Sequence, residues 1–329
     1  MKWRILSVVL ALLFILGLMN YDAINVYVVN TIRTHEPSYR IDFEHSLSWY
    51  LIDNRLSTTY CPQLAYMAAA FSDAAYSRSD IEALLSYRGF NAATRNYGNV
   101  FIPERPAFAM GRKYADNGER IVTVIIRGSR TPNDWVTDFN AQTSNSRGAI
   151  VHRGFYDSMR HVVDELTAFL EVDWMLCNNT TYFITGHSYG GAVTNLLARE
   201  IIRVNEASGN EIRGRVFAYT FGSPEVTQAP LVTAREAAYS SIFNVVNIPD
   251  PVPRVLQESF ISRLTTSQWV RFGQDIHFDS GHELDAGVSG FGAVLSNEGH
   301  EAHNKATYLD LMRQQIEPDS SETVTTAAH

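Results

Sequence analysis

A serine set between glycines is the residue of this sequence best suited to chemistry. Ser188 lies in the run Gly186-His187-Ser188-Tyr189-Gly190, which fits the pattern G-x-S-x-G. In that pattern a sharp strand-to-helix turn exposes the serine oxygen, and larger residues at the glycine positions would collide with the neighbouring strand and helix. The apolar segment Tyr182–Thr185 precedes the turn, and the amphipathic segment Ala192–Val204 follows it. This context predicts that Ser188 is a nucleophile for acyl transfer, rather than a surface serine in a glycine-rich turn.

Acyl transfer also needs two donors directed at the oxygen that becomes negative in the transition state. The backbone N–H of Tyr189, directly after the nucleophile, is one expected donor. The other should follow an earlier central strand, and Ser129 comes directly after the apolar run Val122–Ile126 and the pair Arg127-Gly128. Ser129 is therefore predicted to complete an oxyanion hole, the alternative being an ordinary loop at a strand end.

The acid of a hydrolase triad follows the serine in sequence and stands at the end of a strand. Asp250 fits this position, because it follows the strand pattern Ile242–Asn247 in a proline-rich loop. Glu258 and Asp275 lie further along without this placement. Asp250 is predicted to be the acid, the alternative being a loop aspartate that caps a turn.

The base should be a histidine that follows the acid. His303 and His300 both meet this condition, and His277 lies within a strand pattern that favours a structural role. A base should lie in the loop that enters the last helix, near the carboxyl edge of the sheet where Ser188 also lies, and this favours His303. His187 is adjacent to Ser188 in sequence, but its side chain should point away from the serine at the turn.

The elements that must position these residues alternate between helix and strand patterns. Helices are expected at Gln63–Tyr76, Ser79–Tyr87, Gly154–Leu170, Ala192–Val204 and Glu301–Ile316, and strands at Ala109–Tyr114, Arg120–Ile126, Tyr182–Thr185, Arg215–Phe221, Ile242–Asn247, Val270–Phe272 and Asp275–Phe278. Such alternation predicts an α/β fold with a central, mainly parallel sheet flanked by helices.

Composition limits the classes of protein. With 329 residues, 45% of them hydrophobic, the chain can form one large globular domain. Its net charge of −8 argues against a nucleic-acid partner. No cofactor is expected, and no metal: His300 and His303 have ligand-like spacing, but no carboxylate or thiol pattern accompanies them. The oligomeric state is left open.

The N-terminus resembles an export signal. Lys2 and Arg4 precede an uninterrupted apolar run, Ile5–Met19. We expect residues 1–24 to be a signal anchor or a cleaved signal peptide, residues 40–316 the folded domain, and residues 317–329 a disordered tail. The chain would then be membrane-anchored and face outside the cytoplasm, or be secreted. Under those conditions Cys61 and Cys177 can form a disulfide or remain free thiols.

At several points in order the sequence resembles the class 3, filamentous-fungal type, lipases. The matching segments are Ile126–Ser129, Asn133–Asp138, Val151–Phe155, Gly186–Ala192, Phe221–Pro224, the strand with Asp250, and His303 followed by Tyr308-Leu309. The resemblance implies an α/β-hydrolase fold, hydrolysis of lipid esters, and the triad Ser188, Asp250 and His303. Tyr189 replaces the leucine that is usual in the family, which could narrow the acyl pocket.

The resemblance also implies a lid. Trp135 and Val136 lie among polar residues that include Asp138. A short amphipathic segment of this kind can cover a pocket in water and turn its apolar side toward a lipid interface. An ordinary surface turn is the alternative.

The expected activity is that of a triacylglycerol-type lipase, with a lipid or other ester substrate at a membrane or lipid interface. Phospholipase A1 or feruloyl-type esterase activity is the first alternative, since the sequence does not separate these substrates. A non-catalytic, membrane-anchored binding protein on the same scaffold is the second. The complete triad and the oxyanion serine argue against it.

Overall fold

The computed structural model describes residues 58–98, 104–115, 118–129, 142–170, 179–209, 215–228, 230–258, 268–283 and 291–316. The chain divides into two units, residues 1–41 and 42–329, and every described residue belongs to the second. The expected signal segment, lid and C-terminal tail, together with Cys177, lie outside the described residues. Cys61 is a buried free thiol. Within the described ranges, no helix is both long and apolar enough to cross a membrane.

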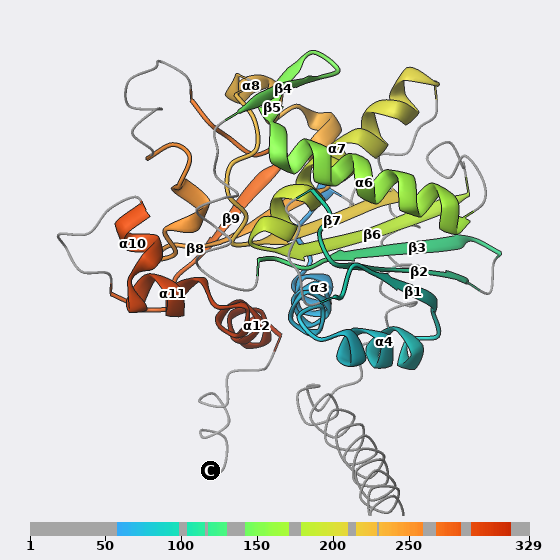
Figure 1. The fold of residues 1–329 in the computed structure, drawn as a ribbon, viewed down its shortest axis with the longest axis horizontal. Helices are drawn as coiled ribbons and strands as arrows, with labels where there is room; N and C mark the ends of the chain where they lie inside the picture. Colours follow the sequence, from blue (N-terminus) through green and yellow to red (C-terminus); the bar gives the residue numbers. More distant parts are fainter. Residues whose placement is uncertain are drawn as a thin grey trace, which may run out of the picture. The chain divides into compact units, whose positions relative to one another are not determined.

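A seven-stranded sheet forms the centre of the fold (Figure 1). The strand order is β1-β2-β3-β6-β7-β8-β9, in which the pairs β1–β2 and β2–β3 are antiparallel and all pairs from β3 to β9 are parallel. The strands are β1 Asn91–Arg95, β2 Phe108–Tyr114, β3 Arg120–Ile126, β6 Thr180–His187, β7 Val216–Phe221, β8 Ile242–Asn247 and β9 Gln274–Phe278. A separate hairpin pairs β4 Thr143–Ser146 with β5 Ala149–His152. The predicted α/β fold with a mainly parallel sheet is confirmed.

Helices cover both faces of the sheet. Figure 1 shows α6 and α7 on one face, and α3, α4 and α12 on the other. The helices are α3 Pro62–Ala74, α4 Arg78–Tyr87, α6 Arg153–Leu170, α7 Tyr189–Ala207, α8 Leu231–Ala234, α10 Phe291–Leu295, α11 Asn297–His303 and α12 Lys305–Gln314, with short 3₁₀ helices η4 Ala237–Tyr239 and η5 Val252–Arg254.

The central strands are buried along almost their whole length because helices cover both faces of the sheet. All residues of β6, β7 and β8 are buried, and so are six of the seven residues of β3. In α6, by contrast, only one side is buried, as its amphipathic pattern predicts. The sheet is therefore a rigid platform whose strand ends carry the polar residues of the site.

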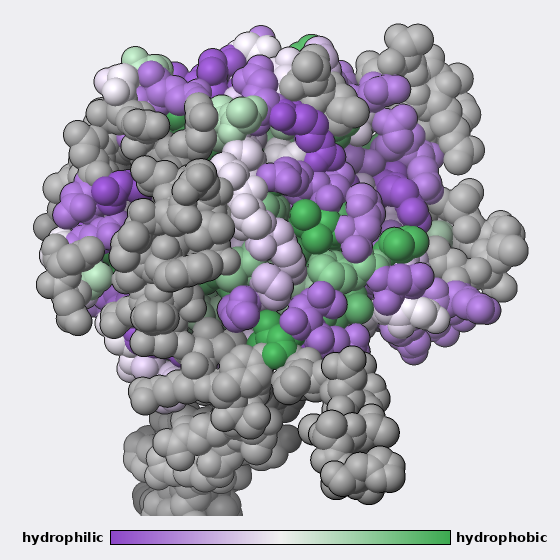
Figure 2. Space-filling view, turned by 180° about the vertical axis from the view of Figure 1, so that it is seen from behind, coloured by the Kyte–Doolittle hydropathy of each residue, from purple (hydrophilic) through white to green (hydrophobic). Residues whose placement is uncertain are grey.

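The described surface is mostly polar on the side of the molecule that faces away in Figure 1. Figure 2 shows the opposite side of the molecule, where hydrophilic residues dominate the coloured surface and hydrophobic ones gather in a small area near the middle. The large hydrophobic side chains exposed among the described residues are Tyr87, Tyr114, Ile150, Ile248 and Leu295.

The segment predicted as one helix over Glu301–Ile316 is two helices. Helix α11 ends at His303, and α12 begins at Lys305. Between them Asn304 is extended, and its side-chain oxygen accepts a hydrogen bond from the Ala306 N–H at 3.0 Å. Asparagine competes for backbone donors in this way, and so it ends one helix and caps the next.

The strand predicted at Val270–Phe272 is also absent as a regular element. Val270 makes only an isolated bridge to Thr227. The backbone of Phe272 is bonded by side-chain amides instead: its N–H donates to Asn195, and its carbonyl accepts from Asn195 and Asn244. These amides occupy the groups that a neighbouring strand would have bonded.

Candidate active site

The turn at Ser188, which is buried, has the backbone geometry expected of a nucleophile between a strand and a helix. Ser188 follows the end of β6 and precedes α7, with φ 59° and ψ −128°. Few residues other than glycine adopt a positive φ, and such strain is typical of functional sites. A Cβ at Gly186 would lie 2.4 Å from the Gly190 carbonyl oxygen, and one at Gly190 would lie 2.1 Å from the Ile126 oxygen. Both glycines are therefore required for strand, turn and helix to pack this closely.

Asp250 and His303, predicted from distant parts of the sequence, are hydrogen-bonded to each other. The distance from His303 Nδ1 to Asp250 Oδ2 is 2.7 Å. The other carboxylate oxygen, Oδ1, accepts from the backbone N–H of Val252 at 2.9 Å. Both side chains are buried, so the carboxylate can fix the orientation and tautomer of the imidazole.

Tyr308 is a third member of this group that sequence reasoning did not assign a role. Its hydroxyl donates to Asp250 Oδ2 at 2.6 Å and accepts from the Asn247 N–H at 3.1 Å. Burial, and then the charge of Asp250, raise the pKa of Tyr308 well above its usual value. The hydroxyl thus keeps its proton at neutral pH and ties α12 to the carboxylate.

The segment Phe221–Gly222 joins the serine to the aspartate–histidine pair. The Phe221 carbonyl accepts a hydrogen bond from the Ser188 N–H at 2.8 Å. Gly222 has φ 56°, and a Cβ on it would lie 2.9 Å from both Asp250 Oδ2 and His303 Nδ1. All three predicted residues therefore converge on the carboxyl end of β7.

The predicted oxyanion residues lie at the same edge. Gly128 follows β3, and a Cβ on it would lie 3.0 Å from Ser188 Cβ, so this loop packs directly against the serine. The next residue, Ser129, is buried. The side chain of Tyr189 packs toward α6, where its ring meets Phe155 edge-on at 5.2 Å and its hydroxyl lies 2.6 Å from Ser158 Oγ.

His187 lies in the middle of the site. From the sequence we expect only that its side chain points away from Ser188. Its Nδ1 is 2.8 Å from the Tyr76 hydroxyl, and its Nε2 is 2.8 Å from the His303 carbonyl oxygen. Its ring stacks on the His303 ring with 4.6 Å between centroids. Burial, and then His303, hold the pKa of His187 well below its ordinary value, so the ring is neutral.

The remaining predicted residues either lie on the surface or fall outside the residues that the structure describes. His300 is exposed on α11, and the lid residues Trp135, Val136 and Asp138 belong to a segment that is not described. Among the described residues, no group of three or more histidine, cysteine or acidic side chains has a metal-binding arrangement.

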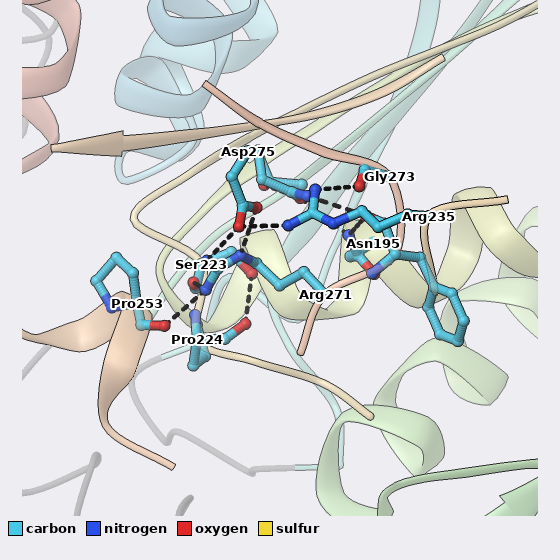
Figure 3. A network of polar contacts seen from close by, with 11 residues as sticks. Asn195, Ser223, Pro224, Arg235, Pro253, Arg271, Gly273 and Asp275 are labelled. Atoms are coloured by element: carbon cyan, nitrogen blue, oxygen red, sulfur yellow. Dashed lines mark hydrogen bonds and ion pairs between the residues drawn. The ribbon is translucent and has the colours of Figure 1, made fainter. Parts of the chain in front are cut away.

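A buried arginine fastens the loops that carry the acid and Gly222 (Figure 3). Arg271 donates through Nη1 to the carbonyl oxygens of Ser223, at 3.0 Å, and Pro253, at 2.6 Å. Its Nε and Nη2 bond the carboxylate of Asp275, which Arg235 also contacts at 2.7 Å. Ser223 follows Gly222 and Pro253 follows the Asp250 turn, so Arg271 sets the spacing of these two loops.

A covered, mainly parallel sheet, a serine at positive φ between a central strand and its helix, and an Asp–His pair beside it define the α/β-hydrolase class. Within that class, residues 123–260 match the family described as lipase (class 3). This match confirms the resemblance seen in the sequence.

Individual relatives match part of the chain. It is 29% identical over 161 residues to secreted mono- and diacylglycerol lipase 1 of Fusarium solani, which covers 47% of this chain and 45% of the relative. It is 26% identical over 147 residues to a lipase of Rhizomucor miehei, covering 44% and 40%. It is 27% identical over 178 residues to phospholipase A1-II 3 of Oryza sativa subsp. indica, covering 44% and 41%. The chain thus spans less than half the length of these relatives.

Among solved structures, the Rhizomucor miehei lipase propeptide complex aligns with a TM-score of 0.48 and 22% identity, over 65% of this chain and 67% of that one.

Proposed function

We propose that this chain hydrolyses carboxylic esters of lipids, with Ser188 as nucleophile, His303 as base and Asp250 as acid. The observation that carries the proposal is the segment Phe221–Gly222. Its first residue bonds the backbone of Ser188, and its second packs against the hydrogen-bonded Asp250–His303 pair. The strained backbone of Ser188 supports the same assignment.

In the proposed reaction His303 Nε2 takes the proton of Ser188 as the serine oxygen attacks the ester carbonyl. Asp250, bonded to Nδ1, stabilises the imidazolium that forms. Ser129 and the backbone N–H of Tyr189 donate to the tetrahedral oxyanion. The alcohol leaves with the proton of His303, and water then hydrolyses the acyl-serine with His303 again as base.

The proposed substrates are acylglycerols of the triacylglycerol-lipase type. The match of residues 123–260 to class 3 lipases supports a lipid ester, and the name of the Fusarium relative, a mono- and diacylglycerol lipase, supports an acylglycerol. The rice relative, named a phospholipase A1, keeps sn-1 phospholipid hydrolysis as the second candidate. Rates on triacylglycerol, diacylglycerol, phosphatidylcholine and a feruloyl ester, compared at one interface composition, would rank them.

We further propose that the enzyme acts outside the cytoplasm, anchored or secreted. Lys2, Arg4 and the run Ile5–Met19 support export, and two relatives are named as secreted lipases. A chain that stays with membranes after a carbonate wash is anchored, whereas a mature N-terminus near residue 20 indicates cleavage.

The decisive experiment is labelling with a fluorophosphonate, which reacts with activated serines. Wild-type protein should be labelled, and Ser188→Ala should not be. Turnover of a p-nitrophenyl ester should fall by as much as ~10⁶, the scale of loss for a triad serine.

Ser240→Ala is a matched control, because Ser240 lies away from the site and its exposed hydroxyl donates to the carbonyl of Ala237, three residues earlier, at 2.7 Å. It should retain full labelling. Undiminished labelling of Ser188→Ala would refute the nucleophile, and an unlabelled wild type would favour a binding protein without catalysis.

A further inference from the structure

A hydrogen-bonded path crosses the site on the side of His303 away from Asp250. It includes Tyr76, the second residue after α3, and His187, the last residue of β6. These two residues are 111 apart in sequence and 2.8 Å apart at their polar atoms. Neither has a part in the proposed reaction steps.

The direction of each hydrogen bond follows from the chemistry of its partners. The His303 carbonyl can only accept, so His187 Nε2 carries the proton and donates to it. A neutral imidazole has one N–H, which leaves His187 Nδ1 as the acceptor for the Tyr76 hydroxyl. The Tyr76 hydroxyl in turn packs against the backbone of Gly128, where a Cβ would lie 2.3 Å from the hydroxyl oxygen.

Both ends of this path are elements of the site. The Gly128 end is the turn that carries Ser129 and packs against Ser188. The other end is the carbonyl of His303, at the last position of α11, where helix carbonyls lack an intrahelical partner. The His187 ring also packs against the His303 ring, with an angle of 35° between the two planes. This contact restricts the tilt of the His303 ring.

Both members of the path remain uncharged around neutral pH. Burial raises the pKa of Tyr76 and lowers that of His187. Lys305 lies over the Tyr76 ring, with its ammonium 5.3 Å from the centroid, and pairs with Asp73 of α3. These contacts hold the phenol ring of Tyr76 in place between α3 and α12.

We propose that Tyr76 and His187 form a positioning pair, which holds the base His303 and the Gly128–Ser129 turn in register with Ser188. The pair makes no hydrogen bond to a reacting atom; it acts through the backbone of His303 and Gly128 and through the contact of the His187 ring with the His303 ring. This inference rests on the proposed function, because it assigns the pair to the same reaction.

The test uses full-length protein and a short, soluble p-nitrophenyl ester. Active sites are first counted by fluorophosphonate titration, so that kcat refers only to correctly folded molecules. Tyr76→Phe keeps the ring and removes the hydroxyl. His187→Leu removes both hydrogen bonds and the stacking, and His187→Gln keeps an amide donor near the position of Nε2.

We expect Tyr76→Phe to lower kcat per active site about tenfold and His187→Leu about 100-fold, the loss associated with a misplacement of about 1 Å. KM should change less than twofold, and His187→Gln should recover part of the loss. The double variant should be no worse than His187→Leu alone, because both substitutions break one path. Tyr97→Phe, which removes a hydroxyl bonded to the nearby Ala75 carbonyl, is the matched control and should stay within twofold of wild type.

A wild-type kcat per labelled site in Tyr76→Phe and His187→Leu, with fewer labelled sites or a lower Tm, would overturn the inference in favour of a purely structural role. That result leaves the proposed function intact. A wild-type protein that the probe does not label would overturn both.

Discussion

At the scale of single residues, two histidines of α11 make an internal comparison. His303 is buried and bonded to Asp250, whereas His300, three residues earlier, is exposed. His303→Ala should therefore abolish turnover, with a loss approaching the ~10⁶ measured when a triad member is removed. His300→Ala should keep at least a tenth of the wild-type rate. An assay of both purified variants on a short p-nitrophenyl ester checks this, and the reverse result would reassign the base.

The residues of the site were predictable where a local pattern marks them. Ser188 stands in a glycine-flanked turn, and Asp250 follows a strand in a proline-rich loop. The hydrogen bond of Tyr308 to Asp250 spans 58 positions, and that of Tyr76 to His187 spans 111. Such contacts depend on how the helices pack on the sheet, so the spacing of residues within one segment cannot predict them.

At the scale of elements, the residue that follows β7 tolerates no side chain. Gly222 combines a positive φ with the close approach of Asp250 and His303. Gly222→Ala should displace that pair, and we expect kcat to fall at least 100-fold.

Gly209 is the matched control, because it also has a positive φ, 74°, but a Cβ there meets nothing within 4 Å. Gly209→Ala should lose about 1 kcal/mol of stability from backbone strain and keep its activity. Thermal unfolding and kcat, measured on both variants, separate strain from displacement. Equal activities would mean that the pair tolerates the added methyl group.

The elements with strong hydrophobic patterns were predicted well, and those held by polar contacts were not. β3, with six buried residues, and the one-sided α6 were expected from their patterns. β1 was missed, because Asn91–Arg95 has no apolar alternation and only pairs with β2 at the sheet edge. The break at Asn304 depends on one side-chain cap, which a periodic pattern does not contain.

At the scale of the whole molecule, one buried carboxyl links stability to pH. Burial raises the pKa of Glu225 from 4.5 to about 7, against the opposing charge of Arg271. Between these two values the folded protein holds a proton that the unfolded chain has released. The contribution of Glu225 to stability is therefore fully present below pH 4.5 and is lost as pH rises to about 7, by up to about 3 kcal/mol.

Glu225→Gln removes this dependence and keeps an oxygen that can accept from the Leu256 N–H. The free energy of unfolding of the variant, relative to wild type, should increase from pH 5 to pH 8. Glu298→Gln, at an exposed position of α11, should leave the dependence unchanged. Denaturant unfolding at the two pH values checks the difference, and a constant difference would show that Glu225 does not titrate in this range.

The position of α11 after every strand of the sheet bears on how the protein is made. A ribosome delivers Ser188 well before His303, so for part of synthesis the emerging chain has the proposed nucleophile without the proposed base. If the proposed function holds, an enzyme with this order of residues would stay inactive toward the membranes of its own host until α11 and α12 pack onto the sheet. The fraction of chains that react with a fluorophosphonate would then equal the fraction that has completed folding. The time at which labelling first appears would be the time of the last folding step.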